Sequence, residues 1–295
     1  MILVAGGSGR LGTHLVADLV ARGLPVRVLT RDPVRAEHLT KRLQIDVVSG
    51  DVRDASSLIP AMAGVTTVVS AVHGFSGTGG VSPASVDRAG NVNLIDAVAG
   101  TGASVVLMSV VGASPDSPME LFRMKDAAEQ YLQRSGAPWT IVRSTAFLEL
   151  WLDLLRQTAG RSGRPLVFGR GENPINFVSV RDVAALAAHV VAAPATRGSI
   201  LEIGGPENLT FNELASRVGR TMSATGGPRH VPRPALRAMA TLAAPFKPEL
   251  SRMARSALVL DSAPFTFDAS AMAEQLPGQR LTTIDEVLGA VPLSS

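Results

Sequence analysis

A glycine-rich turn close to the start of the chain is the feature that most constrains its fold. The turn comprises Gly6, Gly7, Ser8, Gly9, Arg10, Leu11 and Gly12. A short apolar run at 2–5 precedes it, and residues 11–20 repeat apolar side chains with the period of a helix. Glycine allows positive φ, leaves no Cβ between the backbone and a phosphate, and lets the helix pack closely on the strand. Because a helix N-terminus attracts anions, the turn predicts a pyrophosphate-binding site; a glycine turn without a ligand is the alternative.

Beyond the turn, β-branched runs alternate with helix-period segments at short spacing. Strands are expected at 26–30, 46–49, 67–72, 104–109 and 139–143. Such alternation predicts an α/β fold with a doubly wound parallel sheet of the Rossmann type. We expect a dinucleotide-binding core at 1–143, with returning segments near 176–203. Residues 144–175 and 204–295 are expected to form a smaller, mostly helical substrate region, within which the Gly- and Pro-rich stretch 223–234 reads as a mobile excursion.

Composition excludes several classes of protein. The chain has 295 residues, 46% of them hydrophobic, and no cysteine, which rules out disulfides and thiolate metal sites. No apolar run reaches the ~18 residues of a membrane span, and Met1 leads directly into the first strand, so we expect a cytoplasmic protein with no membrane partner. The net charge of +3 is spread along the chain, and no metal-ligand cluster is seen, so neither nucleic acid nor a metal is expected.

The end of the second strand bears on the choice of cofactor. In dinucleotide folds an acid at this point selects NAD(H), whereas an arginine accommodates the 2′-phosphate of NADP(H). Thr30 occupies the position of the acid, and Arg31 follows it. We therefore predict NADP(H) rather than NAD(H), with Arg10 as a second cation. Both arginines could instead be solvated, and Asp32 could accept from a 2′-hydroxyl.

Other strand ends should lie on the same side, because ligands of such sheets bind beyond the carboxyl ends of the strands. The residues expected there are Asp51, Val52, Ser70, Ala71 and Val72. Asp51 could equally be only the cap of the next turn. A glycine-rich loop at 73–80 follows and contains His73, whose imidazole suits proton transfer, although a lone loop histidine is often incidental.

Lys125 is the candidate for the principal catalytic group, with Ser109 or His73 assisting. Only three lysines occur in the chain, so one on the helix after the fifth strand stands out. It could contact the nicotinamide ribose and assist proton transfer. Its alternative role is a surface helical pair with Glu129, four residues later.

Aromatic side chains suggest an apolar substrate pocket. The candidate lining residues are His73, Phe75, Phe147, Trp151 and Phe168. Core packing is the alternative role for the aromatics at helical spacing.

Taken as an ordered set, these motifs resemble the atypical, NmrA-like branch of the short-chain dehydrogenase/reductase superfamily, an NAD(P)H-binding family. The matching pieces are the turn with Gly6-x-x-Gly9-x-x-Gly12 spacing, 31–33, 50–54, 93–97, Lys125 with Glu129, 139–143, 177–184 and 203–206. They extend to about residue 215. The resemblance implies a Rossmann domain that binds NADP(H), with a smaller C-terminal region over the substrate cleft.

One departure from the superfamily pattern concerns the usual Tyr-x-x-x-Lys. Leu121 occupies the tyrosine position relative to Lys125, and Tyr131 has no lysine four residues later. Some relatives, similar to isoflavone reductase, work with the helix lysine alone, whereas others, similar to NmrA, are redox-sensing regulators. We therefore predict an NADPH-dependent reductase of a small, fairly apolar carbonyl, quinone or conjugated substrate. The alternatives are a sensor that binds NADP(H) and a protein partner without catalysis, and third, a nucleotide-sugar epimerase or dehydratase.

Overall fold

The computed structural model describes residues 1–222, 224, 226–270 and 280–289. The chain divides into two compact units. Unit 1 comprises Met1–Ser144 and Val180–Glu202, and unit 2 comprises Thr145–Ser179 and Ile203–Ser295.

Unit 1 is built on a seven-stranded sheet with the order β10-β6-β5-β4-β1-β2-β3. Its strands are β1 (Ile2–Ala5), β2 (Val26–Thr30), β3 (Asp46–Ser49), β4 (Thr67–Ser70), β5 (Ser104–Val110), β6 (Trp139–Ser144) and β10 (Ile200–Ile203). The pairs from β3 across to β6 are all parallel, with Val4 of β1 aligned with Val28 and Val69 on its two neighbours. Parallel strands joined by helical crossovers confirm the predicted Rossmann-like fold.

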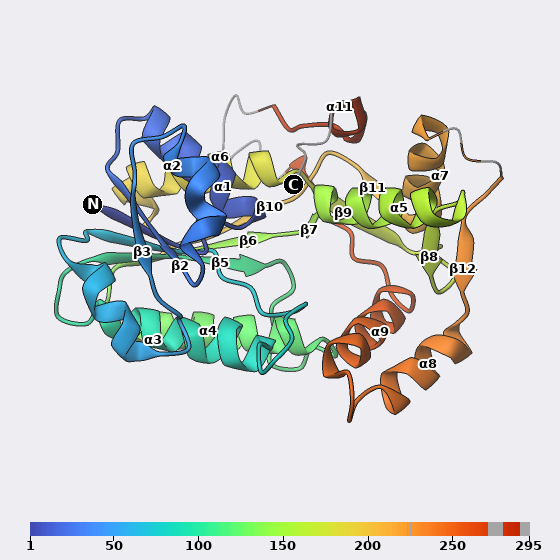
Figure 1. Cartoon of the computed structure of the whole chain (residues 1–295), viewed down its shortest axis with the longest axis horizontal. Coiled ribbons are helices and arrows are strands. Elements are labelled where there is room, and N and C mark those ends of the chain that lie inside the picture. The colour runs from blue at the N-terminus through green and yellow to red at the C-terminus, as the bar shows by residue number, and fades with distance from the viewer. Residues whose placement is uncertain (223, 225, 271–279, 290–295) are drawn as a thin grey trace. The chain divides into compact units, whose positions relative to one another are not determined.

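Helices cover both faces of this sheet (Figure 1). They are α1 (Arg10–Ala21), α2 (Glu37–Thr40), α3 (Ala89–Ala97), α4 (Glu120–Arg134) and α6 (Val180–Ala192). Helix α6 packs along α1, whereas α3 and α4 lie together against the opposite face. The core between α3, α4 and the sheet contains Leu3, Leu94, Leu107, Leu132 and Ile141, all of them at most 2% exposed. Packing of this core holds the carboxyl ends of the strands in place. The candidate site lies at that edge of the sheet.

Short non-α segments occur where helices were expected. Residues Ala55–Met62 form a 3-10 helix that contains Pro60, whose ring removes a backbone donor. The helix predicted from about 83 begins as a π-helical segment, Pro83–Arg88, and becomes α-helical only at α3. Further 3-10 turns span Pro33–Ala36 and Pro194–Thr196. Single π-helical turns are frequent at functional sites.

Unit 2 mixes short strands and helices around its own core. Its elements are β7 (Ala146–Phe147), α5 (Leu148–Ser162), β8 (Leu166–Phe168), β9 (Pro174–Val178), β11 (Asn208–Thr210), α7 (Phe211–Thr221), β12 (Arg229–Val231), α8 (Arg233–Leu242), α9 (Pro248–Leu260) and α11 (Ile284–Gly289). The strands form a β11-β9-β7 sheet and a β12-β8 pair. Leu152, Phe177, Phe211 and Leu214 fill the core between them.

The stretch 223–234 differs from the mobile excursion that its composition suggested. Residues 229–231 form β12, which pairs in parallel with β8, and α8 begins at Arg233. A three-residue strand depends on its partner for its hydrogen bonds, so local composition gives little sign of it. Residues 223 and 225 lie outside the described part of the chain. Among the described residues, no helix has the length and apolar character needed to cross a membrane.

Candidate functional site

The glycine turn joins β1 to α1, and three of its glycines are required by the packing of the backbone. Gly6 has φ +83°, and a Cβ on it would lie 2.7 Å from the carbonyl oxygen of Ala71. A Cβ on Gly7 would lie 2.9 Å from the side chain of Val28, and one on Gly12 would collide with the backbone of Gly6. A side chain at any of these positions would force its neighbours to shift, whether or not a ligand binds.

Gly9 differs from the other three. Its φ of −84° is open to any residue, and its Cβ would meet only the Gly6 carbonyl oxygen, at 3.1 Å. Gly9 precedes α1, whose start is capped by no side chain and whose first turn holds no acid, among the residues that the structure describes. As in any α-helix, its first N–H groups make no hydrogen bond within the helix. Together these features fit a dinucleotide pyrophosphate, which needs close backbone approach and a positive helix end.

The end of β2 lies beside this turn. The hydroxyl groups of Ser8 and Thr30 are 3.0 Å apart, and Arg31 follows with an exposed side chain. The carboxylate of Asp32 accepts from the Val34 amide at 3.1 Å, so it caps the following 3-10 turn. Within the glycine turn itself, Leu11 is buried and Arg10 is exposed.

Asp51 lies after β3, and its charge is largely neutralised by Arg53. The guanidinium makes a bidentate contact with the carboxylate: Nη2 donates to Oδ2 at 2.6 Å, and Nε donates to Oδ1 at 3.1 Å. Hydrogen bonding from Arg53 is the main cause that lowers the pKa of Asp51; burial opposes it, and the charge of Arg31 adds the smallest contribution. Val52 is buried, with a Cγ in the space that a Cβ on Gly90 would need. An anion approaching Arg31 therefore meets an ion pair rather than an unpaired carboxylate.

Lys125 is buried at the carboxyl ends of β4 and β5. Its side chain is 4% exposed, and its ammonium nitrogen Nζ lies 2.9 Å from the Met108 carbonyl oxygen and 3.3 Å from that of Val72. The third neighbour is Asp87 Oδ1, 3.1 Å away. The surface pair with Glu129 is not formed, because both side chains are buried and each has other partners.

Asp87 was not predicted as a site residue, yet it is the centre of this cluster. Its side chain is fully buried in the π-helical segment; Oδ2 accepts from the Gly74 amide at 2.8 Å, and Oδ1 lies 3.6 Å from His73 Nδ1. Burial alone would raise the pKa of Asp87, but the charge of Lys125, together with the nearby His73 and the Gly74 amide, outweighs it, so the pKa lies below its ordinary value. The carboxylate is therefore held in its ionised form at neutral pH.

The cluster adjoins the glycine turn through the segment after β4. Gly6 packs against Ala71, the next residue Val72 accepts from Lys125, and Lys125 pairs with Asp87. Ser70, at the end of β4, donates to the Asn91 amide oxygen, and the Asn91 Nδ2 donates to the Asp87 carbonyl oxygen at 2.6 Å. The predicted residues after β4 thus meet the lysine and the histidine at one edge of the sheet.

Ser109 has a different set of partners. Its hydroxyl donates to the Glu129 carboxylate, which also receives a forked contact from Arg143, with Nη2 to Oε2 at 2.6 Å. Arg143 further pairs with Glu202 at 3.3 Å. Tyr131 donates to Asp96 at 2.6 Å rather than contacting the lysine. The structure therefore brings His73, but not the side chain of Ser109, into the Lys125 cluster.

The aromatic candidates are distributed between the two units. In unit 1 the rings of His73 and Phe75 are 6.1 Å apart. In unit 2 the rings of Trp151 and Phe211 are 4.6 Å apart and tilted by 58°, and Trp151 packs against the core. Phe147 and Phe168 are half-buried, on β7 and β8 respectively. A substrate pocket lined by these residues stays a prediction.

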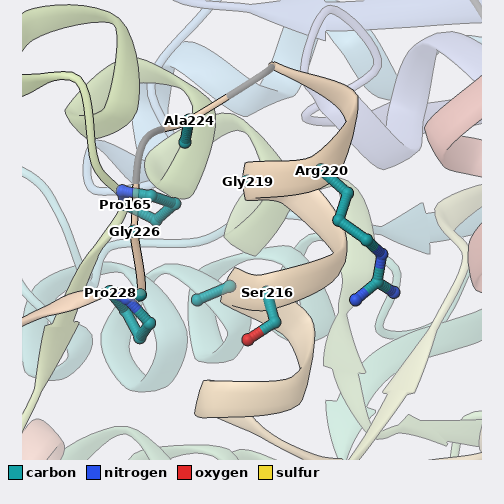
Figure 2. A pocket seen from close by; sticks show the side chains of 9 residues that line it. Pro165, Ser216, Gly219, Arg220, Ala224, Gly226 and Pro228 are labelled. Atoms are coloured by element: carbon teal, nitrogen blue, oxygen red, sulfur yellow. The ribbon is translucent and has the colours of Figure 1, made fainter.

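A hollow of about 320 Å³ in unit 2 contains none of the predicted site residues (Figure 2). It lies between α7 and the segment around 226–228, with Pro165 on one wall and the Arg220 side chain on α7. Since it lacks the buried charges and uncapped helix end found in unit 1, we place the candidate site at the carboxyl edge of the large sheet.

The chain is similar to several known proteins. The model of the NAD(P)H-binding family matches residues 6–194, which span the glycine turn, Asp87 and Lys125. An NAD(P)H azoreductase of Xenophilus azovorans is 30% identical over 221 residues, covering 73% of this chain and 72% of that protein. Among solved structures, the NADPH-dependent quinone oxidoreductase QOR2 of Escherichia coli, complexed with NADPH, superposes with a TM-score of 0.78 at 23% identity, covering 98% of each chain.

A third similar protein is the triphenylmethane reductase of Citrobacter sp., complexed with NADP(H). Its TM-score is 0.76 at 18% identity, with 98% of this chain and 99% of that chain covered. At such identities the two solved structures bear on the fold, whereas the family match rests on the sequence itself. The ordered motifs, the parallel sheet and the match over 6–194 lead to one conclusion: this chain belongs to the NAD(P)H-binding family.

Proposed function

We propose that this protein is an NADPH-dependent reductase of a small, fairly apolar acceptor such as a quinone, an azo compound or a conjugated carbonyl. The observation that carries the proposal is the Lys125–Asp87–His73 cluster, which lies against the segment that packs on the glycine turn. A fold that only bound a dinucleotide would need the turn but not this set of charges beside it. The reductases among the similar proteins support the same class of reaction.

The residues of unit 1 would hold NADPH in defined ways. The N-terminus of α1 and the backbone at Gly9 would bind the pyrophosphate, and Arg31 would bind the 2′-phosphate through its guanidinium. When bound, this cofactor supplies a hydride. The remaining work of the protein is to align the acceptor, exclude water and supply a proton.

The cofactor assignment is tested by calorimetric titration of the cofactor-free protein with NADPH, NADP⁺, NADH and NAD⁺. We expect the phosphorylated pair to bind more tightly. Arg31→Ala should remove most of that preference, lowering NADPH affinity about tenfold, while NADH affinity changes little. Arg35→Ala is the matched control, because Arg35 is an exposed arginine on the neighbouring 3-10 turn. Equal binding of all four dinucleotides by the wild type would refute the assignment.

Catalysis is tested by following NADPH oxidation with a panel of quinones, azo dyes and enones. A reductase is expected to give steady turnover with at least one of them. Tight NADPH binding with no turnover above background across the panel would refute the reductase. That result, combined with a protein partner captured in only one redox state of the cofactor, would favour the redox sensor.

A further inference from the structure

Lys125 is enclosed by oxygen atoms in this arrangement. Its Nζ donates to the carbonyl oxygens of Met108 and Val72, and it forms an ion pair with Asp87 Oδ1 at 3.1 Å. Only 4% of the side chain is exposed. To protonate a substrate, the lysine would have to leave one of these partners and expose a buried carboxylate. The buried ammonium group of Lys125 is instead suited to holding the Asp87 carboxylate in place.

His73 has the opposite character. It lies on the same carboxylate, yet 48% of its side chain is exposed. The contact is made through Nδ1, which lies 3.6 Å from Asp87 Oδ1. A carboxylate beside one nitrogen orients an imidazole ring, which leaves the other nitrogen to act as an acid.

We propose that His73 is the proton donor of the reductase, with Asp87 and Lys125 as the residues that position it. This proposal rests on the proposed function. In the reaction, hydride adds to the acceptor carbon or nitrogen, and the electron pair of the reduced double bond moves to the neighbouring oxygen or nitrogen. That atom takes the proton from His73 Nε2, and the neutral imidazole regains a proton from solvent.

The surroundings of Asp87 fix its position from several directions. Gly74, directly after His73, donates its amide to Oδ2, so the carboxylate anchors the loop beside the imidazole. The π-helical segment sets the backbone of Asp87, and the Asn91 side chain donates to its carbonyl oxygen. A Cβ on Gly74 would collide with Ser82, so the loop approaches the segment closely. A histidine held in this way is more than an incidental loop residue.

The proposal also selects a class of acceptor. Quinones, carbonyls and azo groups become anions when they take a hydride, and therefore need a proton. A cationic triarylmethane dye becomes a neutral molecule with the hydride alone and needs none. A chain with a dedicated proton donor is suited to the first class, and its donor is dispensable for the second.

The kinetic test compares wild type with His73→Gln on both classes of acceptor. With a quinone or azo acceptor we expect kcat to fall about 100-fold or more, the range typical of a lost general acid, while NADPH affinity stays within about threefold. With a cationic triarylmethane dye, kcat should change less than threefold. The quinone reaction of the wild type should also show a solvent deuterium isotope effect that the dye reaction lacks. Unchanged kcat with the quinone, or equal losses with both acceptors, would overturn the proposal.

A second measurement needs no turnover. Imidazole ¹⁵N shifts of the cofactor-free protein report which nitrogen of each histidine carries the proton, and the His73 signal is identified by its absence in His73→Gln. We expect the proton on Nδ1, facing Asp87, in the neutral ring. In the double variant Asp87→Asn with Lys125→Met, which removes both buried charges together, this preference should be lost. A tautomer ratio that is the same in wild type and double variant would refute the positioning role.

The two measurements separate this inference from the proposed function. If no acceptor is reduced by wild type, the reductase fails whatever the ¹⁵N shifts show. If wild type turns over and His73→Gln matches it, only the assignment of the proton donor fails. Lys125 then returns as the candidate acid.

Discussion

The ion pair between Lys125 and Asp87 gives the sharpest prediction about stability. The two side chains are 4% and 0% exposed, and their charged atoms are 3.1 Å apart. Removing one partner of such a pair leaves an uncompensated buried charge, which destabilises a fold by about 3–5 kcal/mol. Lys125→Met should therefore lower the free energy of unfolding at pH 7 by that amount, a large part of the ~5–15 kcal/mol typical of a native protein. Denaturant titration measures it directly.

The loss of stability in Lys125→Met should depend on pH. In wild type the pKa of Asp87 is lowered, so the ionised carboxylate contributes stability above its unfolded pKa, and this contribution is lost as pH falls through the folded value. In Lys125→Met, burial without the lysine should raise the pKa of Asp87. Acidification should therefore protonate Asp87, which removes the uncompensated charge and stabilises the variant. The gap in unfolding free energy between wild type and variant should thus be widest near pH 7 and narrow on acidification below about pH 5.

Two controls make this prediction refutable. Lys41→Met removes a lysine that also lies 3.1 Å from a carboxylate, that of Glu37, but with a side chain 73% exposed, and it should change stability by about 0.5 kcal/mol or less. The double variant Asp87→Asn with Lys125→Met should recover most of the loss, because neither charge is left alone. A loss under about 1 kcal/mol for Lys125→Met, or a gap that does not change with pH, would refute the reasoning.

Three further changes test the glycine turn and the Ser109 cluster. Gly12→Ala should fail to give folded protein by circular dichroism, because its Cβ meets the backbone of Gly6. Gly9→Ala should fold, with a loss of about 1 kcal/mol in chemical denaturation, yet bind NADPH at least tenfold more weakly by calorimetry; unchanged affinity would show that no phosphate approaches this residue. Arg143→Met should lower the free energy of unfolding by about 3 kcal/mol, because it leaves the Glu129 carboxylate buried without its cation, and equal stability in denaturant would contradict that.

The sheet and the cofactor turn could be predicted from sequence because their signals are local. The strand 2–5 and the helix after Gly12 are adjacent in the chain, and their periodicities differ clearly. The arginine after β2 could be proposed as a cofactor contact because the strand order places that strand end beside the glycine turn. Each of these inferences needed only a short window of residues and one rule of parallel sheets.

Asp87 escaped prediction for a physical reason. Its importance depends on Lys125, thirty-eight residues later on another helix, and on a π-helical segment whose geometry no periodicity predicts. One sequence signal was available: an aspartate within a mostly apolar helical stretch that follows the glycine-rich loop, on a helix expected to pack on the sheet. A charged residue in that setting requires a partner, and a scarce lysine on the next helix is the natural candidate.

The absence of tyrosine at position 121 does not by itself favour a sensor over an enzyme. Leu121 is buried in α4, four residues before the lysine, at the position where the Tyr-x-x-x-Lys pattern has its tyrosine. In this chain the exposed imidazole of His73 and the same lysine both contact Asp87. Apolar side chains of similar volume would fill this space with equal or greater stability, since burying two charges carries a large desolvation penalty. We infer that the buried pair is kept for what it positions, and that the acid of this reductase comes from the loop after β4 rather than from α4.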